Sequence, residues 1–92
     1  MSNVYTDTIV TANSINSQAA SLLSQLKSGT ASASVVAQCN TLIAAYTSYI
    51  AAKNGLPQRS GWVAIQEQMS DVFITTDSNI ASIKNFLMVY GY

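Results

Sequence analysis

The chain has 92 residues, 49% of them hydrophobic, and its four basic and four acidic side chains cancel to a formal net charge of zero. Only 9% of the residues are charged, where an average soluble domain carries about 25%. Four scattered basic residues form no patch for nucleic acid or anionic lipid, so we expect no direct nucleic-acid binding.

A first helix is predicted over residues 6–28. Asp7 lies in its first turn and Lys27 in its last, where each charge stabilises the helix dipole. Apolar residues recur at steps of three and four, as on a helix that buries one side: Tyr5, Ala12, Ile15, Ala19, Leu22 and Leu26, widened by Ile9 and Leu23. Gly29 supplies the positive backbone angle that ends a helix. The candidate caps for the next helix are Thr30, Ser32 and Ser34, and so short a connection predicts an antiparallel hairpin.

The second helix is predicted over residues 31–53, an uncharged stretch between Lys27 and Lys53. Its apolar residues include a strict heptad of Val36, Ile43 and Ile50, with Val35, Cys39, Leu42, Tyr46 and Tyr49 between them. We interpret this stripe as the one that the rest of the chain covers. The single cysteine is predicted to be a buried thiol on it. The helix is predicted to end at Lys53, because Gly55 and Pro57 follow.

Two kinds of targeting segment are not expected. Residues 30–52 reach the length of about 20 residues that spans a bilayer, but Gln38, Asn40 and Thr41 cluster near the middle, so no membrane span is predicted. The opening residues, Met-Ser-Asn-Val-Tyr-Thr-Asp, lack the basic start and apolar core of a signal peptide. We therefore expect synthesis in the cytoplasm without Sec-dependent export.

The third helix is predicted over residues 61–90, with Ser60 as its cap and Trp62 in its first turn. Its buried face comprises Met69, Phe73, Ile80, Ile83, Leu87 and Tyr90, with Thr76 completing the pattern. Residues 74–79 are weak helix formers, and Thr76 or Asp77 could cap a separate fourth helix. One helix is favoured, because the stripe keeps its phase. The predicted fold is all-α: residues 1–92 form an up-down-up three-helix bundle, or a long hairpin with a third helix, with termini at opposite ends.

No catalytic pattern accompanies these helices. The chain has no histidine, which excludes the commonest general base and metal ligand, and we expect no enzyme and no cofactor. Glu67 and Asp71 form the only near pair of carboxylates and are interpreted as a solvated face. The candidate interface residues are Leu56, Arg59, Trp62, Tyr90 and Tyr92, of types enriched at interface anchors. Trp62 has a second interpretation, in which it covers the open end of the core.

Two resemblances follow from these residues. Gly61-Trp62 between long helices resembles the secreted helical hairpins of the WXG type, although Ala64 stands where that family has glycine. This resemblance implies a secreted or cytosolic adaptor that binds one protein partner. The low charge and the abundance of Ala, Ser, Thr, Asn and Gln resemble small helical proteins of virus and bacteriophage particles and of extracellular filaments.

The virion resemblance agrees with the argument from charge, because a neutral polar surface is easier to desolvate than a charged one. The leading hypothesis is therefore a non-enzymatic structural subunit, such as a head, neck, tail or cement protein of a virion, with other protein subunits as partners. The segments 14–18 and 66–68 are further candidate contacts. A neutral monomer with a polar coat is the alternative that the composition leaves open.

Overall fold

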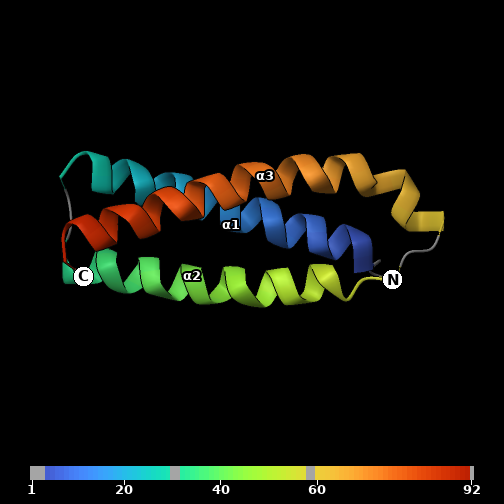
Figure 1. Ribbon diagram of the computed structural model, residues 1–92, viewed down its shortest axis with the longest axis horizontal. Coiled ribbons are helices and arrows are strands. Elements are labelled where there is room, and N and C mark those ends of the chain that lie inside the picture. Colours follow the sequence, from blue (N-terminus) through green and yellow to red (C-terminus); the bar gives the residue numbers. More distant parts are fainter. Residues whose placement is uncertain (1–3, 30–31, 58–59, 92) are drawn as a thin grey trace.

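The computed structural model describes residues 4–29, 32–57 and 60–91, and these form three helices and no strand. They are α1 (Val4–Lys27), α2 (Ala33–Asn54) and α3 (Ser60–Val89). Consecutive helices run antiparallel, so α1 and α3 point the same way and the two ends of the chain lie at opposite ends of the bundle (Figure 1). The bundle measures 45 × 19 × 19 Å. The prediction of an all-α three-helix bundle is thus confirmed.

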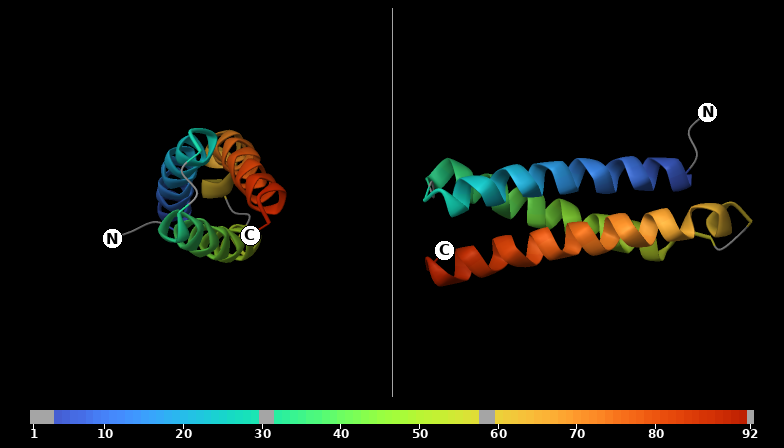
Figure 2. Two further views of the ribbon diagram at one scale, coloured as in Figure 1. Left: turned by 90° about the vertical axis from the view of Figure 1, so that its left-hand side faces the viewer. Right: turned by 90° about the horizontal axis from the view of Figure 1, so that it is seen from above.

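Helix α1 is the element around which the others are arranged. All eight apolar residues predicted for its buried face are buried, and it packs against both α2 and α3, whereas α2 and α3 touch each other at few places. Ala12 and Ala19 are completely buried, and the three helices close around a common axis when viewed end-on (Figure 2). The stripe of α2 is covered as predicted, but α1 rather than α2 makes extensive contact with both other helices. The small side chains of α1 let two helices approach it.

The buried stripe of α2 contains the residues predicted for it, but they are not covered equally. Val35, Cys39, Leu42, Tyr46 and Tyr49 are buried, while the heptad Val36, Ile43 and Ile50 is only partly covered. The heptad lies at the edge of the buried face rather than at its centre. It remains partly open because few residues of α3 lie against α2.

The ends of α2 show how the chain turns. Gly29 has a φ of 88°, the positive angle predicted for the end of α1. Ser32 caps α2, because its hydroxyl accepts a hydrogen bond from the Val35 amide; Thr30 lies outside the described residues. Gly55 follows α2 as predicted, but with a φ of −87°, so this end needs no left-handed residue. The Leu56 amide instead donates to the Lys53 carbonyl.

Helix α3 is continuous through the weak helix formers 74–79, so no fourth helix begins at Thr76 or Asp77. The Thr76 side chain is fully buried, and its hydroxyl donates to the Val72 carbonyl at 2.8 Å. This bond satisfies the hydroxyl within its own helix. Met69, Ile80, Ile83 and Leu87 are buried as predicted, and Phe73 is partly buried. The predicted burial of Tyr90 was wrong, because Tyr90 is 53% exposed. The Ser60 side chain, which was predicted to cap this helix, is not among the side chains that the structure describes.

Candidate interaction surface

The residues predicted as interface anchors lie at both ends of the molecule. Leu56 and Trp62 are half-buried at the end where α2 gives way to α3. Tyr90 lies at the opposite end of the 45 Å bundle and is 53% exposed. These three residues therefore cannot form one contact site. Arg59 and Tyr92 lie outside the described residues.

Trp62 contacts Tyr5 and is half-buried, so part of its ring stays open to solvent. It lies in the first turn of α3, and its ring is tilted by 43° against that of Tyr5, with 6.4 Å between the ring centres. The Tyr5 hydroxyl donates a hydrogen bond to the Pro57 carbonyl. Tyr5 thus ties the start of α1 to the loop before α3. At the far end, Tyr90 stacks on Phe86 with 6.0 Å between ring centres.

Of the two other predicted contact segments, 66–68 is open to a partner and 14–18 is only partly so. In the segment 14–18, Ile15 is buried, and Asn16 accepts a hydrogen bond from Asn79 at 2.7 Å. Ser14, Ser17 and Gln18 of this segment are exposed, as are all three residues of 66–68. Within the segment 14–18, Ile15 and Asn16 therefore face the rest of the bundle, and the other three residues remain open to a partner.

Two buried tyrosines of α2 stack on each other but differ in their polar contacts. Their ring centres are 6.0 Å apart. The Tyr46 hydroxyl donates to Asp77 Oδ1 at 2.7 Å, whereas the Tyr49 hydroxyl is buried with no hydrogen-bond partner among the described residues. Burial raises the pKa of Tyr49, and burial together with the Asp77 carboxylate raises the pKa of Tyr46. The Tyr49 hydroxyl therefore lies within the core.

Helix α3 exposes a row of large apolar side chains that the sequence analysis did not single out. Val63 is 73% exposed, Ile74 62% and Met88 72%. At 3.6 residues per turn, these three and the exposed Ala81 fall within about 40° of one another around the helix axis,. The heptad spacing of Ile74, Ala81 and Met88 was the available signal. The core stripe of the same helix is longer and more regular, so the periodicity was assigned to the core alone.

A second surface is a groove of about 460 Å³ between α1 and α2. Its floor includes Ile15, Leu22 and Leu42, and its walls carry hydroxyl, amide and methyl groups; the wall residues are Gln18, Ser21, Gln25, Ser34, Ala37, Gln38, Thr41 and Ala45. No described residue that lines this groove is charged. Covering it would therefore bury only apolar groups and neutral hydrogen-bonding groups.

The few charges of the described residues do not gather into a chemical site. Glu67 and Asp71 are both exposed on α3, and no group of three potential metal-ligating side chains occurs in the described part of the chain. Lys53 lies 4.2 Å from the centre of the Phe73 ring, a cation–π contact. Burial raises the pKa of the Cys39 thiol. Such a thiol is less readily ionised and therefore less reactive.

No helix in the described ranges is long and apolar enough to cross a membrane. Comparison of the chain with protein-family models, with curated proteins and with solved structures finds no match.

Proposed function

We propose that this protein is a non-enzymatic structural subunit that assembles with other protein subunits, with a virion head, neck, tail or cement layer as the assembly that its composition fits best. The observation that carries the proposal is the solvent-facing side of α3. Val63, Ile74 and Met88 extend into solvent from α3, in a chain of which only 9% of the residues are charged. Apolar side chains aligned along an exposed helix indicate a protein contact.

The end of α3 adds to this apolar surface. Met88, Val89 and Tyr90 are three consecutive exposed apolar residues, and Val89 is 69% exposed. A run of this kind is unfavourable in water unless a partner covers it. Tyr90, one of the predicted interface residues, belongs to this run.

Helix α2 supports the proposal through small side chains rather than large ones. All six of its alanines are exposed: Ala33, Ala37, Ala44, Ala45, Ala51 and Ala52. Between Lys27 and Lys53 the chain has no charged residue. Burying this surface and the adjoining α1–α2 groove removes no ion from water, so association avoids the largest desolvation cost.

The proposal is tested by measuring the molar mass of the purified protein by light scattering after size exclusion. The concentration series extends to about 1 mM, which is enough to detect association with a Kd of about 1 mM, a binding free energy of about −4 kcal/mol. A mass that rises above 9.8 kDa with concentration is the expected result. A monomer at every concentration, alone and when mixed with lysate of its native source, would refute a role in assembly.

A further inference from the structure

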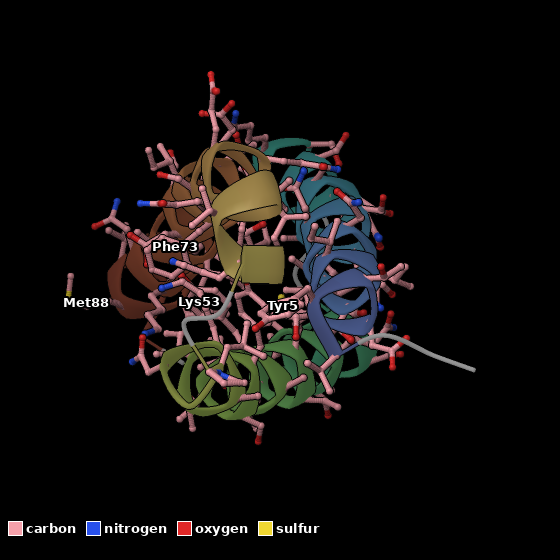
Figure 3. The ribbon with its side chains drawn as sticks, turned by 90° about the vertical axis from the view of Figure 1, so that its right-hand side faces the viewer. Tyr5, Lys53, Phe73 and Met88 are labelled. Carbon is pink, nitrogen blue, oxygen red and sulfur yellow. The ribbon has the colours of Figure 1, made fainter. Side chains whose placement is uncertain are left out.

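We infer that the subunit pairs with a second copy of itself through the outer stripe of α3, defined here as Ile74, Ala81 and Met88, with the two α3 helices antiparallel. This inference rests on the proposed function and names its first contact. The three residues lie one heptad apart on one face of α3, and all are exposed. In Figure 3, Met88 points away from the bundle on the side where Lys53 and Phe73 lie between α2 and α3.

The stripe is symmetric about Ala81, which suits a two-fold axis. If that axis passes beside Ala81, Ala81 meets its own copy, and each Ile74 meets the Met88 of the other chain. An alanine at the centre lets the helix backbones approach closely, and the larger side chains then pack on either side. A self-complementary patch of this kind is what a two-fold dimer requires.

The charges of α3 select the antiparallel arrangement. Asp77 and Lys84 lie on the same flank of the stripe, within about 20° of each other around the axis. A two-fold axis across antiparallel helices brings each flank against the same flank of the partner, in reversed order. Asp77 of one copy therefore meets Lys84 of the other, twice. Parallel helices would instead bring this flank against the one that carries Ser78 and Asn85.

Both charged groups can make this contact. Lys84 is exposed and has no partner among the described residues. Asp77 is exposed and uses Oδ1 to accept from Tyr46, which leaves Oδ2 for the lysine and fixes the position of the carboxylate. The other charges of α3 are less involved. Glu67 lies beyond the overlap of the two helices, and Asp71 lies about 80° from the centre of the stripe.

Helix α2 enlarges the contact. The α2 residues that line the groove face α1. The partly covered heptad lies on the other side of the buried stripe of α2 and therefore toward α3; it consists of Val36, Ile43 and Ile50. With the axis beside Ala81, the two α3 helices overlap over residues 73–89, about 25 Å. Two helices per subunit, each about 10 Å wide over this length, present about 500 Å². A standard interface buries about 800 Å² per partner, so a reversible dimer is expected.

The inference is tested by cysteine cross-linking in a Cys39→Ala background. Ala81→Cys places a thiol beside the two-fold axis, and Ala20→Cys, an exposed alanine on α1, is the matched control. Mild oxidation is expected to link Ala81→Cys chains into dimers and to leave Ala20→Cys chains largely unlinked. Equal linkage of the two variants would overturn the proposed surface.

Charge exchange tests the antiparallel register independently. Lys84→Asp alone and Asp77→Lys alone each place like charges together and are expected to weaken the dimer about tenfold, as loss of an interface anchor does. A mixture of the two variants pairs opposite charges again and is expected to regain wild-type affinity. A mixture that stays monomeric while each variant retains its helical circular dichroism would contradict the register.

The results separate this inference from the proposed function. If the wild-type protein assembles, but Ala81→Cys does not cross-link and Ile74→Asp does not weaken association, the surface is wrong and the structural role stands. If the wild-type protein is monomeric under all conditions, both proposals fail. Ile74 is exposed, so Ile74→Asp leaves the core intact.

Discussion

The stacked tyrosines of α2 provide a test of what a buried hydroxyl contributes to this bundle. Tyr46 and Tyr49 are each 3% exposed and lie one helical turn apart. Replacing either with phenylalanine keeps the ring and removes only the hydroxyl. The Tyr46 hydroxyl is bonded to a carboxylate, and the Tyr49 hydroxyl has no partner among the described residues. We therefore expect the two substitutions to change stability in opposite directions.

The magnitudes follow from these contacts. A hydrogen bond to a charged group contributes about 1.5–3 kcal/mol, but Asp77 is exposed, so Tyr46→Phe is expected to lower the free energy of unfolding by about 1 kcal/mol. Burying an unpaired hydroxyl costs about 1–3 kcal/mol. Tyr49→Phe removes that cost and is expected to raise the free energy of unfolding by about 1 kcal/mol.

Urea denaturation followed by far-ultraviolet circular dichroism measures both effects, at a protein concentration low enough to keep the chain monomeric. For a domain of this size, 1 kcal/mol corresponds to about 4–8 °C in Tm, so thermal unfolding gives a second reading. Tyr90→Phe, at an exposed position, is the control and should leave stability unchanged. Equal destabilisation by Tyr46→Phe and Tyr49→Phe would refute the reasoning, because it would show that the Tyr49 hydroxyl is satisfied.

Three further predictions concern other features of the bundle. The pKa values of Tyr46 and Tyr49 are raised in the folded chain, so the unfolded chain loses these phenol protons first, from about pH 10. The free energy of unfolding should therefore fall as the pH rises above about 10, and it should fall less steeply in Tyr49→Phe. Urea midpoints measured as a function of pH test this. Gly29→Ala should cost about 1 kcal/mol, because φ is positive there,, whereas Gly55→Ala, at φ −87°, should cost little; equal losses in thermal melts would contradict this explanation. Asn79→Ala should destabilise by about 1 kcal/mol by leaving its partner on α1 unpaired,, and a double-mutant cycle with Asn16→Ala should show coupling between the two amides.

Periodicity and turn chemistry determined the helices. The steps of three and four in the apolar residues, with Gly29 and Pro57 at the breaks, were enough to predict three helices and most of their buried residues. They also predicted a continuous α3 across weak helix formers, because an apolar stripe in constant phase outweighs low intrinsic propensity. Apolar periodicity and turn residues depend only on neighbours in the sequence, so the sequence alone is enough to predict the helices.

The arrangement of the helices around one another was decided only by tertiary structure. Both α1 and α2 carry a long apolar stripe, yet only α1 packs extensively against both other helices, because its small, fully buried Ala12 and Ala19 let the neighbours approach. In the same packing, the edge of the buried face of α2 is formed by Val36, Ile43 and Ile50. The Tyr49 hydroxyl is buried without a partner among the described residues. The packing also separated Trp62 from Tyr90 by the length of the bundle.

The candidate interface shows the same division. Composition alone indicated a surface suited to association, because charge content is a property of the sequence. Which residues form that surface depends on which side of each helix the core leaves uncovered. Ile74 and Met88 have the same chemistry as the core residues Ile80 and Met69, and only the packing of α3 against α1 decides which of them face water.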